Sequence, residues 1–281
     1  MIDFKPIATT DKELLTSFIL PSDEQDCDFS FANLCSWHFM TESSYALIED
    51  HLVIRFVTSE GNHEYFMPLG EGSPIPVIEA LEACALSENE PLCLRGVQPK
   101  IQDKLEQYFP TLFEYTSNRD YFDYIYLRED LAFLRGKKFQ QKRNHINNFK
   151  KRYAYEYVEL SGDMIGECLE LEGLWFRASQ AKEDVDELSD ERRSMIFALE
   201  HFNELGLVGG AIRVDGQMVA FTFGAPINHQ TFGVHVEKAN VNYEGAYAVI
   251  NKEFQSIIQD KGFNFDENAS IQLTSYAPNK L

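Results

Sequence analysis

The sequence predicts an α+β protein built from two successive domains, each with a mixed, mostly antiparallel sheet flanked by helices. Its 281 residues, 44% of them apolar, are enough for two hydrophobic cores. Each half shows the same order of elements, which is strand, helix, antiparallel meander, helix and strand. In addition, Asp215 and Gly216 separate two alternating apolar runs, and this dipeptide in that setting is a strong signal for a tight hairpin.

The elements of the first half are short. A strand over 2–7 precedes a helix that begins at Thr10 or Asp11, because both residues are good helix caps. Alternation of apolar and polar residues then predicts a meander of strands, and proline near the first turn marks a later helix. The expected elements are strands over 45–48, 51–57 and 64–69, a helix over 76–87, a strand over 91–96, a helix over 100–108 and a strand over 119–127.

The second half repeats this order with longer elements. They are a strand over 155–160, helices over 164–178 and 190–205, strands over 207–214, 217–224 and 230–237, a helix over 244–261 and a strand over 263–267. We therefore expect one domain over 1–130, a linking helix over 131–153 and a second domain over 154–281.

The predicted linking helix is strongly basic. Residues 135–152 hold eight of the 25 Lys and Arg residues, and no Asp or Glu occurs over 131–155, although the formal net charge is −20. Phe139, Ile146, Phe149 and Tyr153 form one helical stripe that also contains Lys142. Such a field of one sign predicts an anionic partner, such as nucleotide phosphate, nucleic-acid backbone or lipid headgroup. The candidate anion-binding residues are Lys138, Lys142, Arg143, His145 and Lys150. The alternative is a solvated helix whose lysines extend into water.

Composition excludes several other classes. The acidic balance argues against general coating of nucleic acid. Five scattered cysteines, with no C-x-x-C pair, fit reduced thiols and a cytoplasmic location, and no signal peptide or membrane span is evident. The seven histidines show no metal-ligand spacing, so no metal is expected. No P-loop, G-x-S-x-G or G-x-G-x-x-G motif is present.

The element order of the second half resembles the GNAT acyltransferase fold. Particular motifs, RDYFDYIYLREDL at 119–131, KRNHINNF at 142–149, TFGVHVEKA at 231–239 and EGAYAVIN at 244–251, resemble an uncharacterised bacterial family. That family is grouped with the C-terminal domain of phosphatidylglycerol lysyltransferase and is more distantly similar to Fem-type aminoacyl transferases. The resemblance covers nearly the whole chain. It implies two tandem GNAT-like domains, with an active cleft between them, that move an aminoacyl group from aminoacyl-tRNA to an amine or hydroxyl acceptor in a small molecule, lipid headgroup or peptide. The basic helix would then meet tRNA or another polyanion.

The candidate catalytic residues are His235 and Glu237. They alternate along one predicted strand and so face the same side, where one could act as general base and the other as its orienting partner. A partly buried structural pair is the alternative. The candidate pocket residues, each with a plain packing or ion-pair alternative, are Arg119, Asp123, Glu172, Trp175, Tyr247 and Asn251.

Two other functions stay open. An acetyl-CoA-dependent N-acetyltransferase would need phosphate at the start of the helix over 244–261, where Glu244 places a carboxylate that opposes it. A non-catalytic module that binds anions or nucleic acid is favoured by the segment after residue 263, which is shorter than in family members. No tightly bound cofactor is expected, and the co-substrate would be aminoacyl-tRNA or, second, acyl-CoA.

Overall fold

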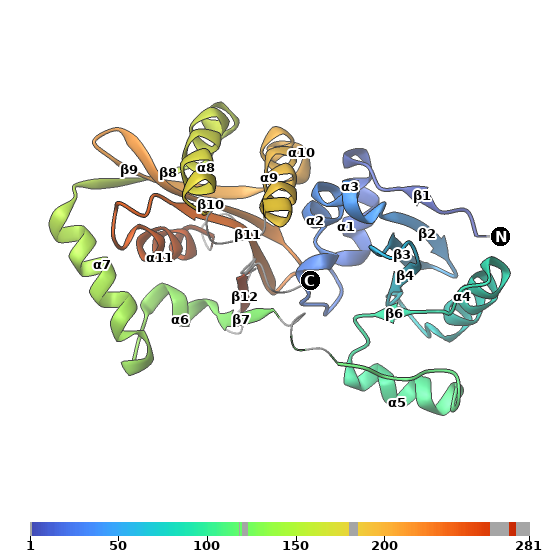
Figure 1. The fold of residues 1–281 in the computed structure, drawn as a ribbon. Helices are drawn as coiled ribbons and strands as arrows, with labels where there is room; N and C mark the ends of the chain where they lie inside the picture. The colour runs from blue at the N-terminus through green and yellow to red at the C-terminus, as the bar shows by residue number, and fades with distance from the viewer. Residues whose placement is uncertain (1, 118, 120–122, 180–184, 259–269, 274–281) are drawn as a thin grey trace. The chain divides into compact units, whose positions relative to one another are not determined.

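The computed structural model describes residues 2–117, 119, 123–179, 185–258 and 270–273. The chain forms two compact units, Met1–Arg119 and Asp120–Leu281 (Figure 1). Each unit contains one sheet flanked by helices, so the predicted α+β class is confirmed. Among the described residues, no helix combines the length and apolar character needed to cross a membrane.

The sheet of the first unit has the strand order β1-β2-β3-β4-β6, with β5 paired to β3. The β2–β3–β4 meander is antiparallel, whereas β4 and β6 are parallel. The elements are β1 Lys5–Pro6, α1 Lys12–Ile19, α2 Phe31–Ser36, α3 His38–Thr41, β2 Ser44–Ile48, β3 His51–Val57, β4 His63–Phe66, β5 Leu69–Gly70, α4 Ile75–Glu88, β6 Leu94–Arg95 and α5 Pro99–Tyr108.

The sheet of the second unit has the order β7-β12-β11-β10-β9-β8. Only the β11–β12 pair is parallel. The elements are β7 Tyr124–Leu127, α6 Arg128–Phe133, α7 Gln140–Arg152, β8 Tyr155–Glu159, α8 Ile165–Ser179, α9 Val185–Glu200, α10 Phe202–Leu205, β9 Val208–Val214, β10 Gln217–Pro226, β11 Thr231–Ala239, α11 Ala246–Ile258 and β12 Ser270–Leu273.

The predicted hairpin lies between β9 and β10. Asp215 and Gly216 both have positive φ, 50° and 78°, which is the conformation that a two-residue turn between twisted strands requires. The Arg213 guanidinium closes the turn by donating to the Gly216 carbonyl at 2.9 Å. The hairpin places β11 next to β10 near the middle of the sheet.

Two groups of helices cover the sheet of the second unit. Helices α8 and α9 lie on one face, whereas α11 lies on the other with α6 and α7 beside it (Figure 1). Side chains of β11 alternate between the two faces except where the register with β10 shifts at His235, so the strand presents some side chains to α11 and others to α8 and α9.

Helix α7 packs within the second unit. Ile146 and Phe149, two residues of the predicted apolar stripe, are 4% and 0% exposed and belong to the core that α11 and β9 also build, which confirms the helix and its buried side. In addition, β7 pairs with β12. Residues 131–153, expected as a link between domains, therefore pack as part of the Asp120–Leu281 unit.

Two further differences from the sequence-based expectation concern the second unit. The helix expected over 190–205 is divided into α9 and α10 at His201, whose φ of −107° and ψ of 26° depart from the helical region. The strand expected over 263–267 lies outside the described residues, and the strand that joins β11 to β7 is Ser270–Leu273.

Candidate functional site

A polar network lies on the α11 side of β11. Lys142 of α7 donates through Nζ to Asn251 Oδ1 of α11 at 2.9 Å, and Asn251 donates through Nδ2 to Glu237 Oε2 of β11 at 3.2 Å. Asn251 is 3% exposed. The network joins three elements that are distant in sequence, and it contains a residue from each of the three predicted sets: catalytic, anion-binding and pocket.

The electrostatics of this network are set mainly by burial. Removal from water raises the pKa of Glu237 to about 7, against the hydrogen bond from Asn251 and the positive charge of Lys142, which both lower it. Burial also lowers the pKa of Lys142, while Glu237 raises it. A carboxyl group with a pKa near 7 is present in both protonation states at neutral pH, and this is the property of a general acid or base.

His235 lies two residues before Glu237 on β11, but the register with β10 shifts between them, because the residues on either side of His235 pair with consecutive residues of β10. The extra residue interrupts the alternation of side chains, so the spacing does not place His235 and Glu237 on one face, contrary to the prediction from the sequence. Burial lowers the pKa of His235 to about 4, so the imidazole is neutral at pH 7. A base with that pKa is weak under neutral conditions. The two predicted catalytic residues therefore differ in basicity, and Glu237 is the better proton acceptor at neutral pH.

The opposite face of β11 carries a second charged group. Lys238 is 5% exposed, and its Nζ lies 3.3 Å from the centre of the Trp175 ring of α8. The same nitrogen donates to Glu191 Oε1 of α9 at 2.7 Å. Nearby, Glu172 of α8 is 2% exposed and lies 3.3 Å from Arg192 Nη1, and burial is the main cause of the raised pKa of its carboxyl. Two predicted pocket residues therefore meet at a buried charged cluster.

Tyr247, in the first turn of α11, connects the two faces at the end of β11. Burial is the largest cause of its raised pKa, and both Glu237 and Glu191 add to it, while Trp175 and the Ala239 backbone lower it. These carboxylates belong to the two groups described above, so the phenol hydroxyl lies within the electrostatic reach of both. Tyr247 and Asn251 are one helical turn apart and share a face of α11, as their spacing predicts.

The cations of α7 and of the turn that precedes it mostly contact groups within the same unit. Arg143 Nη1 donates to the carbonyl oxygens of Leu134, which ends α6 with φ 50°, and of Gly136, the latter at 2.8 Å. Lys138 pairs with Asp130 at 2.8 Å, and Lys150 lies 3.4 Å from Glu253. These contacts give Arg143 a role in ending α6, and they neutralise part of the charge of the helix.

The start of α11 is packed against α7. Gly245 has φ 97°, and a side chain there would bring its Cβ to 2.7 Å from the His145 carbonyl oxygen. Arg152 Nη1 pairs with Glu244 Oε2 at 2.8 Å. The sequence predicts that the Glu244 carboxylate opposes phosphate binding at the start of α11. In the structure this carboxylate is paired with Arg152.

The two remaining predicted residues lie in different units. Arg119 is exposed and ends the first unit, whereas Asp123 is half-buried and precedes β7 in the second.

Several polar residues of the site were not predicted. Lys238 directly follows Glu237, and a lysine within an apolar strand is a signal that could have identified it. Gln255 is fully buried, and within the described part of the chain neither its Nε2 nor its Oε1 has a hydrogen-bond partner. Gln255 follows Asn251 by four residues, as Asn251 follows Tyr247. The sequence therefore already indicated that these three polar residues share one face of α11.

Comparison with solved structures defines the class of the fold. The C-terminal domain of a protein described as a lysylphosphatidylglycerol synthetase from Agrobacterium fabrum aligns with a TM-score of 0.60 at 11% identity, over 95% of this chain and 79% of that one. FemX aligns with a TM-score of 0.59 at 7% identity, over 96% and 88% of the two chains. At these identities the likeness concerns the fold, and it confirms two tandem GNAT-like domains.

Comparison with family models identifies the family. Residues 21–267 match the model of the phosphatidylglycerol lysyltransferase C-terminal domain, and the chain belongs to this family. A conserved protein of unknown function from Bacteroides thetaiotaomicron is 45% identical, with a TM-score of 0.89 over 97% of this chain and 90% of that one. No curated protein sequence matches significantly.

Proposed function

We propose that this chain is an acyltransferase that moves an aminoacyl group from aminoacyl-tRNA to an amine or hydroxyl acceptor. The observation that carries the proposal is the half-buried Glu237 carboxyl, whose pKa is about 7 and which is held by Asn251 in contact with Lys142. Membership of the phosphatidylglycerol lysyltransferase C-terminal family supports the reaction class.

Glu237 acts in the proposal as general base. The acceptor attacks the carbonyl carbon of the aminoacyl ester, and its proton passes to the Glu237 carboxylate. The ester C–O bond to the ribose then breaks, and the proton moves on to the ribose oxygen as it leaves, which restores the carboxylate. A base with a pKa near the working pH is suited to both transfers.

Lys142 and Asn251 position this carboxylate. Asn251 fixes one carboxylate oxygen through its amide, and the Lys142 charge favours the ionised form. Neutral His235 lies two residues from Glu237 on the same strand and is not needed for proton transfer in this proposal. Tyr247, Trp175 and Glu172 are assigned to the acceptor wall at the end of β11, while Arg119 and Asp123 stay as candidates from the sequence.

The exposed cations of α7 and of the turn that precedes it supply the contact for donor phosphates in this proposal. Exposed ion pairs such as Lys138–Asp130 and Lys150–Glu253 contribute only about 0–1 kcal/mol each, so a polyanion can displace the carboxylates at little cost. His145 lies on the same helix and is half-buried. Donor affinity should therefore fall with salt, and Lys138→Ala with Lys150→Ala should make that dependence shallower.

Acetyl-CoA is the second candidate donor. The ion pair of Arg152 with Glu244 weakens the electrostatic objection to a phosphate at the start of α11, because the carboxylate there has a cation 2.8 Å away. An acetyl group would be transferred through the same Glu237 base.

A transfer assay tests the proposal. Purified chain is mixed with tRNA charged with labelled amino acids, or with labelled acetyl-CoA, and with phosphatidylglycerol vesicles, a peptidoglycan-type peptide amine or a pool of small amines. Label is expected in one acceptor from charged tRNA, with a rate at least a hundredfold lower in Glu237→Gln and unchanged in Glu200→Gln, an exposed residue of α9. Transfer from acetyl-CoA alone would select the second donor. Absence of transfer from both donors would contradict the proposal and favour a binding module.

A further inference from the structure

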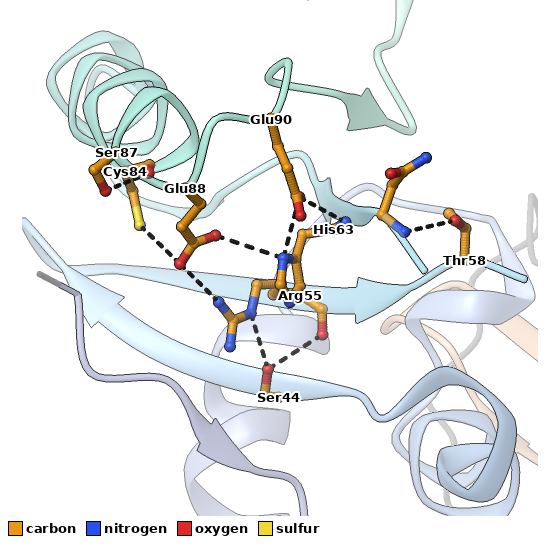
Figure 2. Close-up of polar contacts among 9 residues, drawn as sticks. Ser44, Arg55, Thr58, His63, Cys84, Ser87, Glu88 and Glu90 are labelled. Atoms are coloured by element: carbon orange, nitrogen blue, oxygen red, sulfur yellow. Dashed lines mark hydrogen bonds and ion pairs between the residues drawn. The ribbon is translucent and has the colours of Figure 1, made fainter. Parts of the chain in front are cut away.

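A separate cluster of polar side chains lies in the first unit, at the end of α4 (Figure 2). Glu88 is the last residue of α4, and Asn89 follows in the left-handed conformation with φ 61°. This cap turns the chain sharply, and the Glu90 N–H donates to the Ala85 carbonyl at 3.0 Å. As a result, carboxylates on both sides of Asn89 point toward the same strand, β4.

The carboxylates of Glu88 and Glu90 both lie close to His63, the first residue of β4. Its Nδ1 lies 3.1 Å from Glu90 Oε2 and 3.5 Å from Glu88 Oε2. The His63 backbone N–H also donates to Glu90 Oε2 at 3.0 Å, which fixes that carboxylate against the strand. All three side chains are about one-quarter to one-third exposed, so they are accessible but partly desolvated.

The separations match the edges of a metal coordination polyhedron. Two ligands that each lie about 2.0–2.1 Å from a tetrahedral Zn²⁺ ion are roughly 3.3–3.4 Å apart. The His63 Nδ1 contacts of 3.1 and 3.5 Å bracket this value, and one ligand atom from each of the three residues lies within 4.8 Å of the other two. Small side-chain adjustments would therefore bring all three atoms into coordination.

We propose that His63 Nδ1 and one carboxylate oxygen each from Glu88 and Glu90 bind a divalent transition-metal ion, with Zn²⁺ the best fit. One imidazole nitrogen and two carboxylates form a mixed N/O set, which suits Zn²⁺ better than Mg²⁺ or Ca²⁺, ions that prefer oxygen alone. Three protein ligands leave a fourth position for water. The site joins the end of α4 to β4, so the ion would stabilise the fold of the first unit.

Tyr65 gives an independent indication of an additional polar group here. It is 1% exposed, and its hydroxyl has no hydrogen-bond partner within the described ranges. Tyr65 lies two residues after His63 on β4, so both side chains are on the same face of the strand. A buried hydroxyl without a partner is costly, and a metal-bound water is the kind of partner that it lacks.

The positive charge of Arg55 would repel a metal ion bound by these ligands. Its Nη1 lies 3.8 Å from Glu88 Oε1, the carboxylate oxygen other than the one that faces His63. The guanidinium is also held 4.1 Å from the centre of the Phe4 ring. His63 and Arg55 both line one cavity of about 410 Å³. Removing the Arg55 charge should therefore strengthen metal binding, an effect that a purely structural ion cluster would not produce.

Calorimetric titration of the chelator-treated full chain with Zn²⁺ tests the proposal, together with melting curves in Zn²⁺ and in Mg²⁺. We expect one ion per chain and a rise in Tm with Zn²⁺ but not with Mg²⁺. The Zn²⁺ affinity should fall at least tenfold in His63→Asn and in Glu90→Gln and rise in Arg55→Gln. His201→Asn is the matched control, because His201 contacts a single carboxylate, that of Glu204, in the second unit. Its affinity should equal that of the parent.

Circular dichroism without metal shows whether each variant is folded, and Glu90→Gln keeps an oxygen that can accept from the His63 backbone. Binding that is absent, or that survives both His63→Asn and Glu90→Gln in folded proteins, would overturn the proposal. So would an equal loss in His201→Asn. The cluster would then be a hydrogen-bonded group of His63 and two carboxylates without a metal ion.

Discussion

Asn251 on α11 donates to Glu237 on β11 across 3.2 Å, and the same side chain accepts from the Lys142 ammonium at 2.9 Å. A primary amide has both a donor and an acceptor, so one side chain satisfies a carboxylate and an ammonium together. This bridge joins α7, α11 and the central strand of the sheet in the second unit.

Replacing Asn251 by Ala should destabilise the protein by about 1–3 kcal/mol, because Glu237 and Lys142 each lose a hydrogen bond in a partly buried setting. Urea unfolding followed by fluorescence measures the change. Asn148→Ala, at an exposed position of α7, is the control and should change stability by less than about 0.5 kcal/mol. Equal effects of the two substitutions would show that the bridge contributes nothing specific.

The raised pKa of Glu237 predicts how stability depends on pH. The folded protein holds the proton up to about pH 7, whereas an unfolded Glu releases it near 4.5, so the folded state binds more protons between these values. Stability contributed by this group is therefore present below pH 4.5 and lost as pH rises through 7. Glu237→Gln should flatten the fall between pH 5 and 8 by on the order of 1–3 kcal/mol. Parallel curves for parent and variant would refute the shift.

Arg143 should stabilise the protein through its hydrogen bonds at the end of α6. Arg143→Ala removes the donors to the Leu134 and Gly136 carbonyls, and we expect a loss of about 1–2 kcal/mol, measured by thermal and urea unfolding. Lys151→Ala removes an exposed charge from the same helix and is the control, with little expected effect. If Arg143→Ala leaves stability intact but weakens polyanion binding, the residue belongs to the anion surface as the sequence suggests.

Alanine substitutions at Gly216 and Gly245 distinguish the cost of backbone strain from the cost of steric overlap. Gly216→Ala meets open space and carries only the strain of φ 78°, about 1 kcal/mol, whereas Gly245→Ala adds a Cβ 2.7 Å from the His145 carbonyl oxygen at φ 97°. We expect Gly245→Ala to cost at least 2 kcal/mol more, since α7 and α11 must separate. Similar unfolding midpoints for the two variants would argue against the close packing of these helices.

Much of the fold could be predicted because local patterns agreed with the tertiary structure. Asp215-Gly216 identified the β9–β10 turn, and the stripe containing Ile146 and Phe149 identified the buried side of α7. The packing of α7 within the second unit could not be predicted, because it depends on contacts with α11 and on the pairing of β7 with β12. Sequence periodicity contains no information on such long-range partners.

For the site, alternation on β11 predicted that His235 and Glu237 share one face, but a register shift at His235 interrupts that alternation. The difference in their pKa also comes from surroundings that no spacing reveals. Lys142 and Asn251 were both singled out, but for donor phosphates and a pocket wall, whereas the structure shows them in contact. Their positions are 109 residues apart, so only the fold brings them together. The pairing of Lys138 and Lys150 with acidic residues could not be predicted for the same reason.

The measurement that tests the central claim most directly is the pH dependence of aminoacyl transfer by the parent and by Glu237→Gln. If Glu237 is the base, the rate of the parent should rise with an apparent pKa near 7, while the variant should be slow and lack that inflection. A Glu237→Gln protein with the parent rate and the same inflection would contradict the assignment of this carboxyl to the reaction.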